Sequence, residues 1–211
     1  PRVDAIGGSS AGAYVDNDGT FDFEHLGNVV RQVVPFLDRV IDINYYPTPE
    51  AEFSNHKWRP VGLGLMGLQD VFFKKSLAFD SPEAKALSEQ ISAHIYFHAL
   101  WSSTELAEVH GPHGAYEGTR AAKGELQFDL WHREGRTGEL GVTPPSELDW
   151  DALRGRINEH GLRNSLLIAI APTATIASIV GCYECIEPQV SNLFKRETLS
   201  GEFLQINRYL V

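Results

Sequence analysis

The chain has 211 residues, of which 43% are hydrophobic and 22% are charged, and its formal net charge at pH 7 is −10. This composition is typical of a globular protein, and the negative charge disfavours a general nucleic-acid binder, which needs a basic face for phosphates. Because the sequence has neither an apolar run of membrane-spanning length nor a basic and apolar leader, we expect a cytoplasmic protein with no membrane or nucleic-acid partner.

The first segment, residues 1–20, is rich in glycine, serine and alanine and predicts a flexible N-terminal end. We place the folded domain at residues 21–211. Within it, apolar residues recur at helical spacing from 21 to 43, although Pro35 should kink or interrupt that helix. The Tyr-Tyr-Pro-Thr-Pro sequence of residues 45–49 then ends it.

A short apolar run at residues 60–68 is expected to begin as a strand, and it contains GLGLMG at residues 62–67. This G-x-G-x-x-G spacing indicates a dinucleotide site only where a buried strand precedes it and an acid closes the next strand. Here polar and aromatic residues, 56–60, precede it, and Asp70 lies too near to bind a ribose. We therefore favour close packing of strand on helix through the glycines, with nucleotide binding as the alternative.

The clearest helix start is Ser81-Pro82-Glu83, which combines a capping serine, a proline at the first helical position and an acid in the first turn. This helix should run to about His110. A long polar connection with a few short elements, residues 111–147, should follow. Another helix is expected from Asp149 to His160, and the apolar run at 166–170 then predicts a buried strand. Short strands alternating with helices favour an α/β fold.

The loop after that strand, Pro172-Thr173-Ala174-Thr175, is the best candidate binding site. A strand that leads through proline and small residues into a helix leaves several N–H groups unpaired, and the helix dipole adds positive charge there. We expect Thr173 and Thr175 at a helix N-terminus, with the N–H groups of residues 174–177 facing a concave surface. Such a terminus binds phosphate without a lysine, but a threonine-capped helix without a ligand explains the local residues equally well.

The two cysteines of the chain, Cys182 and Cys185, form a C-x-x-C pair. Two cysteines are too few for a secreted disulfide framework, which favours a reducing compartment. The pair could be a redox or disulfide pair, or half of a metal site, but the scattered histidines supply no second pair of ligands. We favour two buried, reduced cysteines and expect no metal site, with a disulfide as the alternative.

Long stretches of the sequence resemble the large, catalytic subunit of class I ribonucleotide reductase. The resemblance runs from about residue 21 to residue 211 and is carried, in order, by NVVRQVVPFLDRVIDINYYPTPEAEFSNHKWRPVGLGLMGLQDVF, AKGELQFDLW, HGLRNSLLIAIAPTATIASIVG and IEPQVSNLFKRETLSGEFLQINRYLV.

This resemblance implies that the chain forms part, roughly half, of a ten-stranded α/β barrel that reduces ribonucleoside diphosphates to deoxyribonucleoside diphosphates. In the family, a cysteine thiyl radical abstracts the 3′ hydrogen, and a cysteine pair that thioredoxin or glutaredoxin restores supplies the electrons. The implied partners are therefore the substrate, one of these reductants, the rest of the large subunit and its homodimer. A small subunit, with a metal-centred or tyrosyl radical as its cofactor, starts the chemistry; this chain itself should bind no cofactor. Nucleotide effectors, ATP among them, regulate the family.

The resemblance also assigns the loop. The family's P-[ST]-x-[ST] loop holds the substrate diphosphate, and the matching residues here are Pro172, Thr173, Ala174, Thr175, Ile176 and Ala177. Some relatives have a hydroxyl residue at Ile176, which can offer only its N–H group. The C-x-x-C pair does not align with the family's redox cysteines, and the radical cysteine and radical tyrosines belong outside Pro1–Val211. We therefore expect no catalytic residue in this chain and no activity from it alone; the alternative is a non-catalytic binding module that reuses this part of the fold.

Overall fold

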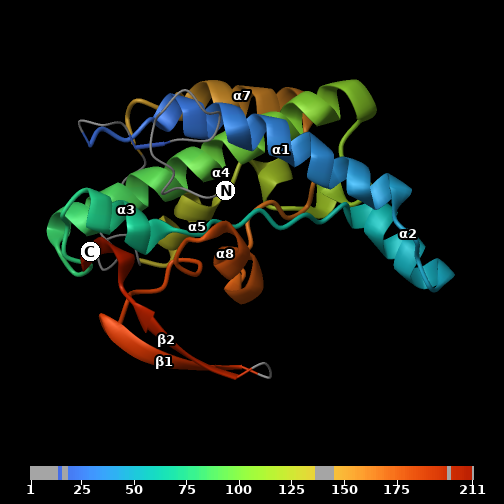
Figure 1. Ribbon diagram of the computed structural model, residues 1–211. Helices are drawn as coiled ribbons and strands as arrows, with labels where there is room; N and C mark the ends of the chain where they lie inside the picture. Colours follow the sequence, from blue (N-terminus) through green and yellow to red (C-terminus); the bar gives the residue numbers. More distant parts are fainter. Residues whose placement is uncertain (1–13, 16–18, 136–144, 199–200, 211) are drawn as a thin grey trace.

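The computed structural model describes residues 14–15, 19–135, 145–198 and 201–210. Most of these residues lie in helices, and two strands form a hairpin near the C-terminus (Figure 1). The elements are α1 (Phe23–Ile43), α2 (Pro49–Trp58), α3 (Leu68–Lys74), α4 (Pro82–His110), the 3-10 turns η1 (Tyr116–Gly118) and η2 (Ala121–Lys123), α5 (Gln127–Arg133), α7 (Trp150–His160), α8 (Ala174–Val180), the strands β1 (Leu193–Thr198) and β2 (Gly201–Ile206), and the 3-10 turn η3 (Arg208–Leu210).

The core of the molecule lies between three helices, with α4 packed against both α1 and α7 (Figure 1). Their starts are capped as the sequence predicts: the side chains of Asp22, Ser81 and Asp149 each accept a hydrogen bond from the N–H group three residues later. Burial of the apolar stripes then holds the helices together. The fully buried side chains include Leu26, Val30, Val34, Ile91, Leu153 and Ile157. The expected helices at 81–110 and 149–160 are confirmed.

Helix α1 continues through Pro35, so of the two expected effects of this proline the interruption is wrong, and the kink stays a prediction. Proline lacks an N–H group, which leaves the carbonyl oxygen of Arg31, four residues earlier, without its helical donor. The hydroxyl of Ser102 on α4 donates a hydrogen bond to this oxygen at 3.3 Å. The neighbouring helix therefore supplies the donor that proline removes, and the helix remains continuous.

Two extended segments, residues 61–65 and 166–170, lie side by side in parallel below the helices. Leu63 pairs with Ile168; the N–H of Leu63 donates to the carbonyl of Leu167 at 2.7 Å, and the N–H of Ala169 donates to the carbonyl of Leu63 at 3.1 Å. Each segment then leads into a helix, the first into α3 and the second into α8. The two units have the strand-then-helix order of an α/β fold.

The second of these segments is not the buried strand that its apolar sequence predicts. Leu167 is only 6% exposed, but Leu166, Ile168 and Ile170 are 65%, 36% and 44% exposed. The reason is that this segment pairs with residues 61–63 along one edge, while among the described residues little covers its outer face. Apolar sequence alone does not tell which face of a strand its own chain covers.

A buried polar network fastens the beginnings of both segments. Arg59 donates from Nε to Oδ1 of Asp38 at 2.9 Å and from Nη1 to Oδ1 of Asp42 at 2.8 Å. Nδ2 of Asn164 donates to the same Asp38 oxygen at 2.8 Å, and Oδ1 of Asn164 accepts from the hydroxyl of Ser103 on α4 at 3.0 Å. Because Arg59 and Asn164 each lie two residues before one of the segments, α1 and α4 fix where each segment starts.

Two regular elements have no counterpart in the sequence-based expectations. The first is α2, which Thr48 caps, and the second is the antiparallel hairpin, whose register runs from Leu193↔Ile206 to Thr198↔Gly201. The hairpin projects away from the helices at the bottom of Figure 1. Most of its described side chains are exposed.

The N-terminal boundary predicted at residue 20 falls in a sparsely described region. Tyr14 and Val15 are buried at 3% and 2% exposure, and Val15 pairs with Phe21. The glycine-rich residues 1–13 lie outside the described residues, so the boundary stays a prediction. Among the helices that the structure describes, none combines the length and apolar character needed to cross a membrane.

Candidate functional site

The candidate loop has the local structure that its residues predict. After the extended segment and Pro172, Thr173 takes a left-handed conformation, with φ 58°, at the N-cap position of α8, and its side chain makes no capping hydrogen bond to the helix. The helix spans Ala174–Val180 and ends at Gly181, which is also left-handed. Thr173 and Thr175 therefore lie at a helix N-terminus, as expected.

The first turn of α8 presents three N–H groups. Within the described part of the chain, the N–H groups of residues 174–176 meet no hydrogen-bond acceptor. The N–H of Ala177, which we expected to be available as well, instead donates to the carbonyl of Thr173 at 2.8 Å, because this is the first bond of the helix. The available donors are thus those of Ala174, Thr175 and Ile176.

The two threonine hydroxyls differ in their surroundings. The oxygen of Thr173 accepts a hydrogen bond from the N–H of Cys185 at 2.8 Å, so it is tied to the following loop but can still donate its own hydrogen. The side chain of Thr175 is exposed and meets no partner among the described residues. Thr175 is therefore the more accessible of the two hydroxyl donors.

The glycines of GLGLMG contact protein, as expected. A methyl group added to Gly64 would lie 2.7 Å from the carbonyl oxygen of Ala169, and one added to Gly62 would lie 3.1 Å from the Ala169 side chain. Gly67 has φ 86° and begins α3, and its N–H donates to the carbonyl of Tyr183 at 3.0 Å. The glycines thus allow residues 61–65 to approach the segment before the candidate loop.

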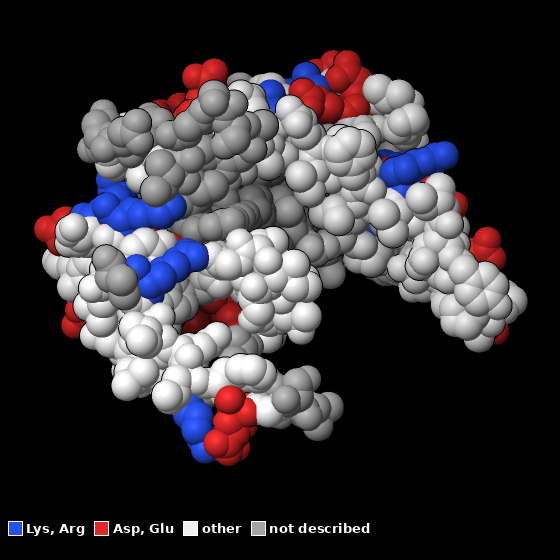
Figure 2. All heavy atoms as spheres, in the orientation of Figure 1, with Lys and Arg blue, Asp and Glu red and all other residues white. Residues whose placement is uncertain are grey.

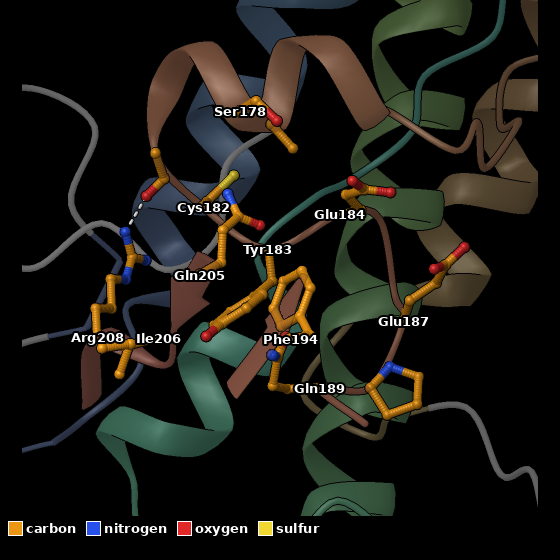
Figure 3. A pocket seen from close by; sticks show the side chains of 13 residues that line it. Ser178, Cys182, Tyr183, Glu184, Glu187, Gln189, Phe194, Gln205, Ile206 and Arg208 are labelled. Atoms are coloured by element: carbon orange, nitrogen blue, oxygen red, sulfur yellow. Dashed lines mark hydrogen bonds between the residues drawn. The ribbon is translucent and has the colours of Figure 1, made fainter. Parts of the chain in front are cut away.

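The two cysteines occupy different environments and are thiols rather than a disulfide. Cys185 is buried, with φ 45°, and its N–H group donates the hydrogen bond to Thr173 at the candidate loop. Cys182 is half-buried and lines a cavity (Figure 3). Among the described residues, no group of three or more histidine, cysteine, aspartate or glutamate side chains is arranged to hold a metal ion.

A cavity of about 470 Å³ lies between the second half of α8, the loop that follows it and the hairpin (Figures 2 and 3). Sequence reasoning did not find it, because its walls come from segments that only the fold brings together. Residues 174–176 of α8 are not part of its lining. Its polar lining residues include Ser178, Cys182, Glu184, Glu187, Gln205 and Arg208.

Beside this cavity lies Asp70, a carboxylate on α3 with no exposed surface. Its oxygens accept hydrogen bonds from the N–H of Tyr183 at 2.6 Å and from the hydroxyl of Tyr209 at 2.8 Å, and from the guanidinium of Arg208. Burial, followed by the hydrogen bond to Asp70, raises the pKa of Tyr209, so its hydroxyl stays protonated and donates. No local pattern in the sequence predicts this cluster, because Tyr183, Arg208 and Tyr209 reach Asp70 only through the fold.

Comparison with known proteins identifies the family. The profile of the family described as "Ribonucleotide reductase, barrel domain" matches residues 9–211. The chain is 45% identical over 198 residues to the ribonucleoside-diphosphate reductase large subunit of Caenorhabditis elegans, which covers 94% of this chain and 24% of that protein. It is 46% identical to the large chain of the same enzyme from Schizosaccharomyces pombe, over 92% of this chain and 23% of that protein.

The large subunit of Trypanosoma brucei brucei is 49% identical over 198 residues, covering 92% of this chain. The chain thus spans about a quarter of the length of these relatives, 24% for the trypanosome protein. The family match confirms the expected fold class, a part of an α/β barrel, and the parallel segments at 61–65 and 166–170 fit it. The chain therefore belongs to the ribonucleotide reductase barrel-domain family.

Proposed function

We propose that this chain contributes part of the substrate-binding wall of a ribonucleoside-diphosphate reductase large subunit, and that the loop Pro172–Ala177 binds the diphosphate of the substrate. The observation that carries this proposal is the first turn of α8, where three consecutive N–H groups have no acceptor in the described structure. Helix N-termini bind phosphate because these N–H groups and the helix dipole both favour negative charge.

Each residue of the loop would have its own role. Pro172 ends the extended segment, and the small side chain of Ala174 leaves room for a phosphate oxygen to reach the backbone. Ala174, Thr175 and Ile176 would donate their N–H groups, and Thr175 would add its hydroxyl. Each such hydrogen bond to a charged group contributes about 1.5–3 kcal/mol.

Two residues of the loop would act mainly by shaping it. Thr173 accepts the N–H of Cys185 and can donate its hydroxyl hydrogen at the same time, so it would both fix the turn and contact the anion. Ala177 is fully buried and its N–H belongs to the helix, so its contribution would be to packing. Ile176 would act through its backbone alone.

The family's chemistry would come from other parts of the large subunit. We propose that neither Cys182 nor Cys185 carries the thiyl radical or supplies the reducing electrons, since neither matches the family's redox positions. A small subunit with a metal-centred or tyrosyl radical would start the reaction, and thioredoxin or glutaredoxin would restore the electrons. The 211-residue chain alone would then form no deoxyribonucleotide, even with substrate and reductant supplied.

The loop assignment can be tested by titrating the isotope-labelled chain with cytidine diphosphate and, separately, with cytidine, while following amide NMR signals. We expect the diphosphate to shift the amides of residues 174–176 in a saturable way, and cytidine to leave them unchanged. Thr175→Ala should weaken binding by about tenfold, the lower end of the value of one hydrogen bond to a charged group. Thr48→Ala makes the same change at the N-terminus of α2 and should leave the affinity unaltered. Saturable shifts elsewhere with none at residues 174–176 would refute the loop's role.

A further inference from the structure

Helix α8 is connected at both ends to one buried carboxylate, that of Asp70. The helix itself has only seven residues and one fully buried side chain, Ala177, so packing alone holds it weakly. Its N-terminal and C-terminal connections run through different segments of the chain, and both reach Asp70 on α3.

The N-terminal connection runs through the loop that follows the helix. The peptide groups around Tyr183 are held on both sides by α3: the N–H of Tyr183 donates to Oδ2 of Asp70 at 2.6 Å, and its carbonyl accepts from the N–H of Gly67 at 3.0 Å. Two residues later, the N–H of Cys185 donates to the hydroxyl oxygen of Thr173 at 2.8 Å. The capping residue of α8 is thereby held by a loop that Asp70 holds.

The C-terminal connection runs through Arg208. One guanidinium nitrogen donates to the carbonyl of Gly181, which ends α8, and another donates to Oδ1 of Asp70. Figure 3 draws the bond to Gly181 as a dashed line. The hydroxyl of Tyr209 donates to the same oxygen of Asp70 at 2.8 Å and so holds the end of the hairpin in place.

Asp70 is suited to this task because its own position is rigid. It lies in α3 between side chains of the core, and its neighbours Val71 and Phe72 are 0% and 1% exposed. A carboxylate offers two oxygens with several acceptor positions, so one side chain can hold three donors from two segments at once.

We propose that Asp70 is a positioning residue that sets the orientation of the first turn of α8, and thereby the anion affinity of a loop that it does not touch. This inference rests on the proposed function of Pro172–Ala177. It assigns a role in substrate binding to a residue on another element. It also predicts the direction in which anion affinity changes when Asp70 is neutralised. If Asp70 acted only as a nearby negative charge, its neutralisation would strengthen anion binding. As a positioning residue, its neutralisation weakens binding.

The test uses the 211-residue chain with inorganic pyrophosphate as the probe, and compares Asp70→Asn with Asp80→Asn. Asparagine keeps the size of Asp70 but replaces one acceptor oxygen with an amide that cannot accept. Asp80 is an exposed carboxylate in the turn before α4, so its variant makes the same change in charge without these contacts. We expect Asp70→Asn to weaken pyrophosphate binding by about tenfold, the value of one charged hydrogen bond, and Asp80→Asn to change it less than about twofold. Equal or stronger binding by Asp70→Asn would overturn the proposal.

A second readout, amide hydrogen exchange, does not depend on ligand binding. Asp70→Asn should accelerate exchange at Tyr183, whose carboxylate acceptor becomes a neutral amide with one oxygen fewer, and also at Cys185, whose acceptor Thr173 is unaltered. Acceleration at Tyr183 alone would show that the connection stops there and would contradict the proposal. If the wild-type chain binds no pyrophosphate, the proposed function fails, while the exchange at Cys185 still decides whether Asp70 positions the loop.

Because Asp70 is buried, its variant could fail to fold, which circular dichroism would reveal. Tyr209→Phe is then used in its place, since this change keeps every charge and removes one donor to Asp70, together with one acceptor of Arg208. It should accelerate exchange at Cys185 and weaken pyrophosphate binding in the same direction, by a smaller factor. A folded Tyr209→Phe chain with unchanged exchange at Cys185 and unchanged affinity would overturn the proposal.

Discussion

Ser102 on α4 donates its hydroxyl hydrogen to the carbonyl oxygen of Arg31 on α1, the oxygen that Pro35 leaves without a helical donor. The distance is 3.3 Å and Ser102 is 1% exposed, so water cannot readily replace the bond. A proline within a helix thus coexists with an unbroken α1 because the helix packed against it provides the compensating donor.

We expect Ser102→Ala to lower the free energy of unfolding by about 1–3 kcal/mol, since it leaves a buried carbonyl without a donor. The effect should shrink in a Pro35→Ala background, where the restored N–H can donate to Arg31 within the helix. Chemical denaturation of the four proteins in this double-mutant cycle measures the coupling between the two positions. Ser88→Ala is the control, because the hydroxyl of Ser88 donates to the carbonyl of Ala84 on its own helix. Additive effects of Ser102→Ala and Pro35→Ala would contradict this account.

The helices that were predicted correctly carry their signals locally. The starts at Ser81 and Asp149 depend on a side chain that caps an N–H group three residues away, which a short stretch of sequence contains completely. The continuity of α1 at Pro35 has no such local signal, because the compensating donor is Ser102, 71 residues away in sequence and adjacent only in the fold.

The candidate site divides in the same way. The order of strand, Pro172 and Thr173 is local, so the helix start that it forms could be predicted. The contacts that hold this turn could not be predicted, because Asp70 is 138 residues from Arg208 and 113 residues from Tyr183 in the sequence. The exposure of Leu166 could not be predicted either, because it depends on which other segments cover that face of residues 166–170.

The buried network at Asn164 should be among the most sensitive positions of the core. Asn164 is 1% exposed; its amide donates to Asp38 and to the carbonyl of Arg59, and its oxygen accepts from Ser103. Asn164→Ala leaves these groups buried with fewer partners, and we expect it to lower the free energy of unfolding by about 2–4 kcal/mol. Asn158→Ala, at an exposed position of α7, should change it by less than about 0.5 kcal/mol. Urea denaturation followed by circular dichroism measures both, and similar losses in the two variants would refute this role for the network.

Two glycines should respond in opposite ways to the same substitution. Gly64→Ala would place a methyl group 2.7 Å from the backbone oxygen of Ala169, which forces the two extended segments apart. We expect Gly64→Ala to lower the free energy of unfolding by about 1–3 kcal/mol, as is typical of overpacking. Gly155 lies inside α7 with nothing within 4 Å of an added methyl group, so Gly155→Ala should stabilise the protein by about 0.5–1 kcal/mol. Thermal unfolding of the two variants measures whether each is stabilised or destabilised. Stabilisation by Gly64→Ala would contradict the close approach of the segments.

The last prediction concerns pH and the two histidines that α4 turns toward α1. Nδ1 of His98 accepts a hydrogen bond from Nε of Arg31 at 3.1 Å, and the His98 ring lies against Gly27, whose added methyl group would be 2.3 Å from Nε2. Burial, together with the nearby charges of Arg31 and His94, lowers the pKa of His98 to about 4. Burial also lowers the pKa of His94, although Glu147, 3.8 Å away, opposes that change.

The sign of the effect on stability follows from these pKa values. An unfolded chain protonates its histidines near pH 6.5, whereas the folded chain resists protonation until about pH 4 at His98, so the unfolded state binds more protons in between. The contribution of the neutral imidazole to stability is therefore complete above pH 6.5 and is lost as the pH falls toward 4. We expect the free energy of unfolding, measured by urea denaturation at several pH values, to decline through this window. His98→Gln can still accept from Arg31 but cannot be protonated, and should flatten the decline. His110→Gln, at an exposed position of the same helix, should leave it in place. An undiminished decline in His98→Gln would show that His98 is not its source.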